Sequence, residues 1–99
     1  MEVQFPEKDL NVIIGKLKEV MGDRELSKMV NFEKQSEGLL VTISKLGTST
    51  LHFDCKQTPQ GCHLTLSKEK IALAHRPLKN EVTNKIIKVI EQAGGKVSQ

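Results

Sequence analysis

The chain has 99 residues, of which 37% are apolar and 27% are charged, and its formal net charge is +3. This length is typical of one domain with its own core, and no apolar run approaches the ~18 residues that a membrane span needs. The N-terminal segment lacks the apolar stretch of a secretory signal, and two cysteines are too few for a disulfide framework. We therefore expect one domain over residues 1–99, located in the cytoplasm, with reduced thiols and no membrane association.

The small net positive charge of the chain does not favour nucleic acid as the partner. Lys and Arg together number 15 against 12 acidic residues, and the two kinds are mixed along the chain. Arg, the better reader of phosphate and guanine, occurs only at positions 24 and 76. Trp and Tyr are absent and Phe occurs three times, so stacking platforms for bases are scarce. Nucleic-acid binding through dispersed Lys is therefore the alternative rather than the leading hypothesis.

The N-terminal part of the chain has the pattern of an amphipathic helix. Pro6 suits a first helical position, and apolar residues recur at helical spacing from Leu10 to Met21. This predicts a helix of about four turns that ends near Gly22. Asp23 is expected to cap a further short turn over residues 24–28.

The middle of the chain alternates apolar and polar residues with a period of two. Successive side chains on a strand point to opposite faces, so this alternation predicts an antiparallel sheet with one buried and one solvent-exposed face. The five expected strands are 29–34, 39–44, 50–55, 62–67 and 71–75. The expected turns between them are 35–38, 45–47, 58–61 and 67–70.

The register of the second hairpin follows from its loop. A three-residue loop at 45–47 that ends in Gly suits a type I turn with a G1 bulge. This loop pairs Ser44 with Thr48 and Val41 with Leu51, so that inward residues face inward residues.

The loop around Pro59 leaves two registers open. A four-residue loop sets Gln57 opposite Cys62, and Cys55 is then diagonal to Cys62. A loop two residues longer sets Cys55 directly opposite Cys62. In both cases the cysteines face inward, and we expect them to act as small buried hydrophobic residues.

The C-terminal part has the pattern of a second helix. Asn80 is expected to cap it, apolar residues recur at helical spacing from Val82 to Ala93, and a Gly pair at 94–95 ends it. The tail 96–99 is expected to fray or to add a few residues to a sheet edge. The predicted fold class is α+β, with a five-stranded antiparallel meander and N- and C-terminal helices packed on one face.

The sheet face that two helices cannot cover is the main candidate for a binding surface. Thr is favoured at exposed strand positions by propensity alone, but the scarcity of bulky charges on this face also suits a contact surface. Its expected members are Thr42, Ser44, Thr50, His52, Asp54, His63, Thr65 and Ser67, with Ala72 and Ala74 beside them.

Two smaller groups of residues offer other chemistry. In the longer-loop register, His52, Asp54 and His63 would gather into a small-molecule or weak metal site, although a structural zinc site wants four ligands. His75 and Arg76 lie just before the second helix, where they could bind an anion. We expect neither a metal nor a cofactor.

Catalytic motifs are missing from the sequence, which has no nucleophile elbow, phosphate-binding loop or zinc-protease motif. We therefore expect a small non-enzymatic binding or interaction module that uses the open Thr/Ser/His-rich face. Its expected partner is another protein or a second copy of the chain, as a homodimer. The residues do not fix the identity of that partner.

Overall fold

The computed structural model describes residues 1–22 and 25–98, and the structural statements below concern these residues. The elements in chain order are β1 (Glu2–Phe5), α1 (Leu10–Met21), the 3₁₀ helix η1 (Glu25–Lys28), β2 (Val30–Gln35), β3 (Gly38–Ser44), β4 (Thr48–Thr58), β5 (Gly61–Lys70), the 3₁₀ helix η2 (Leu73–Leu78), α2 (Lys79–Gln92) and β6 (Lys96–Ser98). Asp23 and Arg24, expected to begin a short turn, lie outside the described residues.

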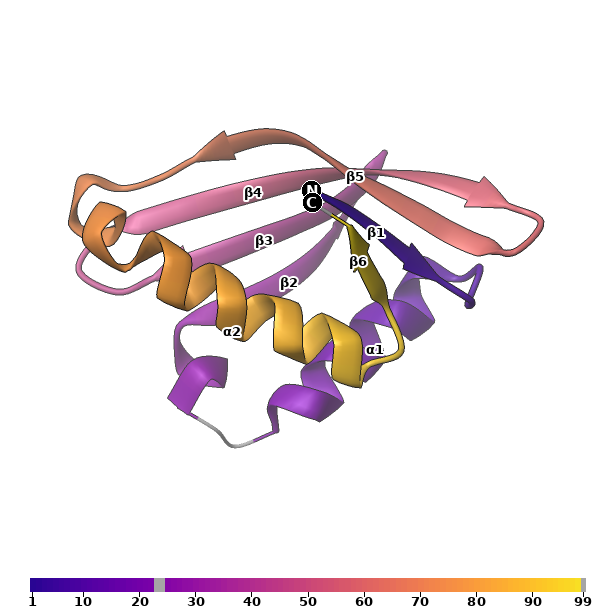
Figure 1. The fold of residues 1–99 in the computed structure, drawn as a ribbon, viewed down its shortest axis with the longest axis horizontal. Helices are drawn as coiled ribbons and strands as arrows, with labels where there is room; N and C mark the ends of the chain where they lie inside the picture. Colours follow the sequence, from indigo (N-terminus) through magenta and orange to yellow (C-terminus); the bar gives the residue numbers. More distant parts are fainter. Residues whose placement is uncertain (23–24, 99) are drawn as a thin grey trace.

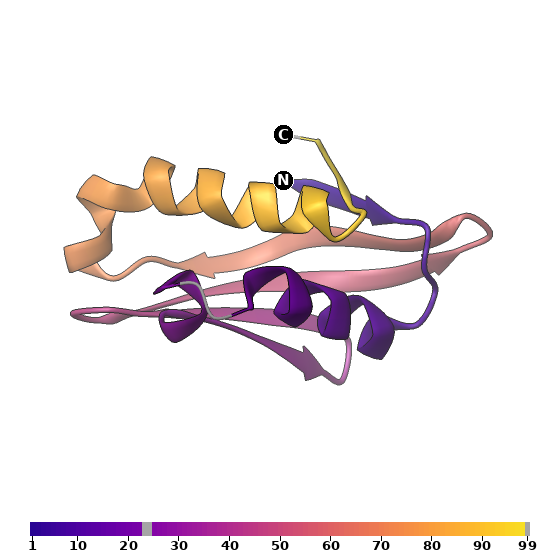
Figure 2. The ribbon, with the colours of Figure 1, turned by 90° about the horizontal axis from the view of Figure 1, so that it is seen from below.

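The strands form one antiparallel sheet in the order β2-β3-β4-β5-β1-β6. Figure 1 shows α1 and α2 on one side of this sheet, and Figure 2 looks at that side and shows the two helices next to each other. The predicted α+β class, the antiparallel meander over β2–β5 and the helices on one face are confirmed. The predicted number of strands is wrong, because β1 and β6 extend the sheet beyond β5 and residues 71–75 do not join it.

The N-terminal segment forms a strand before it forms a helix. Val3 and Phe5 are each only 1% exposed, and β1 pairs with both β5 and β6. Pro6 lies in the connection that follows, so its expected place in the first helical turn is wrong. The cap of α1 is Asp9, whose carboxylate accepts the Asn11 backbone N–H at 2.9 Å.

The helix-facing side of the sheet holds the core. The buried stripe of α1 and the inward residues of β2–β5 are those that the periodicity predicted, and all three Phe are at most 3% exposed. In α2, Ile86, Val89 and Ile90 are buried as expected, but the helix begins at Lys79 without a side-chain cap, so Asn80 is not its N-cap.

The two hairpin registers are resolved. Ser44 pairs with Thr48 and Val41 with Leu51, as predicted, but Leu46, with φ of 58°, is the left-handed residue of this loop, so the expected type I turn with Gly47 in a G1 bulge is wrong. Around Pro59 the register is that of the four-residue loop, with Gln57 opposite Cys62, and the pairing continues to Thr58 and Gly61. A β-bulge then shifts the β4–β5 register, so that His52 pairs with Lys68 and Ser67 is the extra residue.

The segment after the bulge differs from the prediction. Residues 67–70 were expected to turn, but β5 continues along β4 to Lys70. Residues 71–75 were expected to form a strand, and they instead leave the sheet and enter η2. No Gly or Pro breaks the chain at 67–70, so extending the long pairing with β4 replaces a tight turn. Among the described residues, no helix is long and apolar enough to cross a membrane.

Candidate functional site

The sheet face opposite the helices carries most of the residues that the sequence predicted for a binding surface. Seven of them alternate with buried core residues and therefore point away from the helices: Thr42, Ser44, Thr50, His52, Asp54, His63 and Thr65. Ser67 lies at the bulge, where its hydroxyl donates to the His52 carbonyl at 3.1 Å. Ala72 and Ala74 are not on this face, because the chain has left the sheet there.

Four uncharged side chains form the centre of this face, and we call them the central patch: Leu40, Thr42, Thr50 and His52. They make two directly opposed pairs between β3 and β4, Leu40 with His52 and Thr42 with Thr50, and all four are partly buried. The sequence interpretation missed Leu40, because the adjacent Leu39 already filled the inward position.

Charged residues flank the central patch on opposite sides. On β2, Glu33 pairs with Leu40, and on β5, Lys68 pairs with His52. One row across four strands therefore runs from an acid through Leu40 and His52 to a base, and we call it the cross-strand row. Its ends are three strand spacings apart, or about 14 Å. The bulge is essential to this row, because without it Ser67 would stand opposite His52.

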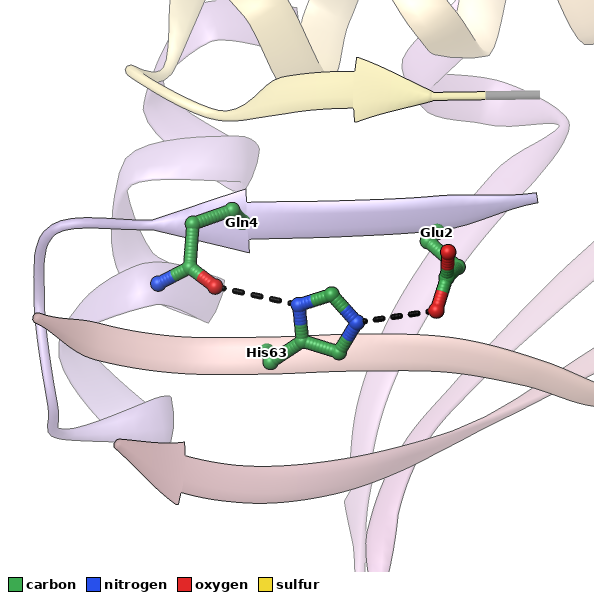
Figure 3. A network of polar contacts seen from close by, with 3 residues as sticks. All are labelled: Glu2, Gln4 and His63. Carbon is green, nitrogen blue, oxygen red and sulfur yellow. Dashed lines mark hydrogen bonds and ion pairs between the residues drawn. The ribbon is translucent and has the colours of Figure 1, made fainter.

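His63 lies near the other end of the face, between two side chains of β1 (Figure 3). Its Nε2 lies 3.0 Å from the Glu2 carboxylate and its Nδ1 lies 3.0 Å from the Gln4 amide oxygen. Gln4 donates its amide N–H to the Phe5 carbonyl at 3.1 Å, which fixes the orientation of the amide. Both ring nitrogens thus face acceptors, so both contacts are hydrogen bonds when His63 is the imidazolium.

This network helps to align β1 with β5 rather than to build a reactive site. The His63 and Glu2 side chains are 34% and 55% exposed, so their ion pair is worth at most about 1 kcal/mol. The sequence contained a signal for it, because Glu2 and Gln4 alternate with the buried Val3 and Phe5.

The expected cluster of His52, Asp54 and His63 does not form. It required the longer loop at Pro59, and in the observed register Asp54 pairs with Thr65 while His63 is turned toward β1. Within residues 1–22 and 25–98, no three His, Cys, Asp or Glu side chains are grouped so that they could hold a metal ion. The weak metal or small-molecule site proposed for these residues is thus not assembled.

The two cysteines are paired as a disulfide across the β4–β5 hairpin. Cys55 and Cys62 are diagonal neighbours with Cα atoms 6.5 Å apart, within the range that a disulfide spans. The expectation of two reduced thiols is wrong for this structure, because the diagonal position is also close enough for bonding. Cys62 is completely buried.

His75 points into the protein and is part of a buried polar chain. The Ala72 N–H donates to the Ser49 hydroxyl at 2.8 Å, and Ser49 Oγ lies 2.6 Å from His75 Nδ1. On the other side of the ring, Nε2 contacts the Lys45 carbonyl, which can only accept, so in the neutral ring Nε2 carries the proton and Ser49 donates to Nδ1. This chain ties the β3–β4 loop to the segment between β5 and η2.

These contacts engage the polar side-chain atoms of His75 and Ser49, so neither side chain is available to bind an anion or to act as a nucleophile. Both nitrogens of His75 are engaged and the residue is 7% exposed, so it does not form the expected anion site with the exposed Arg76. Ser49 is 1% exposed and its oxygen already accepts the Ala72 N–H, so it is not placed as a nucleophile. The sequence signal for this network was Ser49, a polar residue at an inward position of β4.

Comparison of the chain with protein-family models, with curated proteins and with solved structures found no match.

Proposed function

We propose that the protein is a small non-enzymatic interaction module, and that its open sheet face pairs with the same face of a second copy. The central patch is the observation that carries this proposal. Four partly buried uncharged side chains lie at the middle of an uncovered sheet face, with Glu33 on one side and Lys68 on the other. An uncharged centre with a charged rim is the usual anatomy of a protein interface.

The size of the face also suits a dimer. The four strands around the central patch, β2 to β5, hold 34 residues, and at about 16 Å² of sheet each they give roughly 540 Å² for one copy. A standard stable interface buries about 800 Å² per partner, and side chains at the rim add area to the flat estimate.

The cross-strand row is complementary to itself. A twofold axis that runs parallel to the strands between β3 and β4 places one side of the face over the opposite side of its copy. Glu33 of one copy then lies over Lys68 of the other, and Leu40 lies over His52. Two equivalent charge pairs and two equivalent central contacts follow from a single axis.

The same face is poorly suited to single-stranded nucleic acid. Stacking of bases needs exposed aromatic rings, and Phe5, Phe32 and Phe53 are all buried in the core. The basic residues of the face also alternate with Glu2, Glu33 and Asp54, which would repel phosphates. These features favour a protein surface as the partner.

Sedimentation equilibrium tests the proposal. The wild type should form a dimer as its concentration rises to about 1 mM, where even a millimolar affinity is visible. Thr50→Lys should remain monomeric over the same range, because it adds a charge to the central patch beside Lys70. Asn84→Lys, which adds the same charge to the exposed surface of α2, should dimerise normally.

A wild type that remains monomeric at the highest concentration would contradict the proposal. A dimer that is equally stable with Thr50→Lys would also contradict it, because a different surface would then form the contact.

A further inference from the structure

A cavity of about 310 Å³ lies on the helix side of the sheet, away from the open face. Its apolar walls include Leu51 and Leu66 from the sheet, Ile71 from the segment after β5, and Val82 from α2. It lies where the first turns of α2 pass over the inward side of β4 and β5. Ser49 and His75 also contact the cavity, but their polar atoms are already paired within the protein.

One side of the cavity is polar and carries the side-chain ammonium of Lys79. Lys79, Asn80 and Thr83, on the first two turns of α2, bring an ammonium, an amide and a hydroxyl to the lining. Glu69 supplies the only carboxylate among the lining residues, and its Oε1 lies 3.0 Å from Lys79 Nζ. These two side chains are 37% and 48% exposed, so their ion pair is weak and Lys79 can turn to another anion at little cost.

We propose that this cavity binds a small aliphatic carboxylic acid, with the hydrocarbon chain between the sheet and α2 and the carboxylate at Lys79. Branched aliphatic walls without exposed aromatic rings suit a saturated chain. The start of a helix favours an anion over a cation, and Lys79, the first residue of α2, adds a positive charge there.

The volume limits the length of the chain. A cavity of about 150 Å³ in another protein accepts benzene, which has six heavy atoms. A cavity of about twice that volume should therefore accept about ten to twelve heavy atoms, and octanoate has ten. The proposal is independent of the open face, since the sheet separates the two surfaces.

Titration with sodium octanoate, followed by ¹⁵N chemical shifts, tests the proposal. Octanoate should cause saturable shifts at Leu51, Leu66 and Val82, and octylammonium should bind more weakly than octan-1-ol. Lys79→Gln should weaken octanoate binding about tenfold and leave octan-1-ol unchanged, since it removes one charge-assisted contact. Lys88→Gln, on the exposed side of the same helix, should change neither.

A filling substitution tests the position of the chain. Val82→Phe should abolish octanoate binding by occupying the cavity, whereas Val12→Phe adds the same ring at a site that is 42% exposed on α1 and should have no effect. If far-UV circular dichroism shows that Val82→Phe does not fold, Thr83→Leu fills the same wall with a smaller group and should weaken binding.

Three results would overturn the proposal. The first is an absence of saturable shifts with octanoate, and the second is octanoate binding that folded Val82→Phe or Thr83→Leu leaves unchanged. The third is tighter binding of octylammonium than of octanoate, because the polar end would then be recognised by Glu69.

Discussion

Replacement of Ser49 by Ala tests whether the buried polar chain stabilises the fold. The substitution leaves His75 Nδ1 without its donor and the Ala72 N–H without its acceptor. His75 is 7% exposed and Ala72 is partly buried, so water can replace the two lost hydrogen bonds only in part.

The expected loss can be worked from these two groups. A buried polar group without a partner costs about 1–3 kcal/mol, and Ala72 should lie at the lower end because it is partly exposed. The sum is about 2–4 kcal/mol, against a total stability of about 5–15 kcal/mol for a chain of this length. The midpoint of thermal unfolding should fall by about 10–25 °C.

Urea and thermal unfolding should be followed by far-UV circular dichroism, because the chain has neither Trp nor Tyr for fluorescence. Ser44→Ala is the matched control, since Ser44 is exposed at the end of β3, and it should change stability by less than about 0.5 kcal/mol. If Ser49→Ala costs no more than Ser44→Ala, the buried polar chain does not stabilise the fold.

Two further predictions concern backbone fit and the cysteines. Gly15→Ala should stabilise the protein by about 0.5–1 kcal/mol, because a Cβ there meets nothing within 4 Å and Gly is a poor helix former. Gly38→Ala should destabilise it by more than about 3 kcal/mol, because its Cβ would overlap the Phe53 carbonyl oxygen, and urea unfolding of the two variants should give shifts of opposite sign. Reduction of the Cys55–Cys62 pair should cost about 2 kcal/mol by the loop-entropy estimate, and Cys55→Ser should not respond to reductant; equal stability of the reduced and oxidised wild type would contradict this.

The strongly periodic parts of the fold could be predicted from the sequence. The stripe of α1 and the inward residues of β2–β5 repeat often enough for the period to be read, and the three-residue length of loop 45–47 gives the register of the β3–β4 hairpin. β1 offers only Val3 and Phe5 as a pattern, and it becomes a strand because β5 and β6 pair with it from distant parts of the chain. Residues 71–75 alternate like a strand, but β5 continues along β4 to Lys70 and the chain then leaves the sheet and enters η2.

The sequence was sufficient to predict which residues lie on the open face, but not which of them stand opposite one another on neighbouring strands. Alternation is sufficient to assign Thr42, Thr50 and His52 to the open face. The β-bulge, which no residue pattern announces, sets Lys68 opposite His52 and thereby completes the cross-strand row. The Ser49–His75 contact joins residues 26 positions apart, so it could not be read from local pattern.

Double charge reversal across the open face tests whether two copies pair through this face. Glu33→Lys and Lys68→Glu should each weaken the dimer in sedimentation equilibrium, because each places like charges opposite one another across the twofold axis. The combination of both should restore dimerisation toward the wild-type affinity. Within one copy the two positions are about 14 Å apart, beyond the screening length of about 8 Å at physiological salt, so rescue would report a contact between copies. Losses that add in the double variant, or dimers unaffected by either single change, would contradict the account.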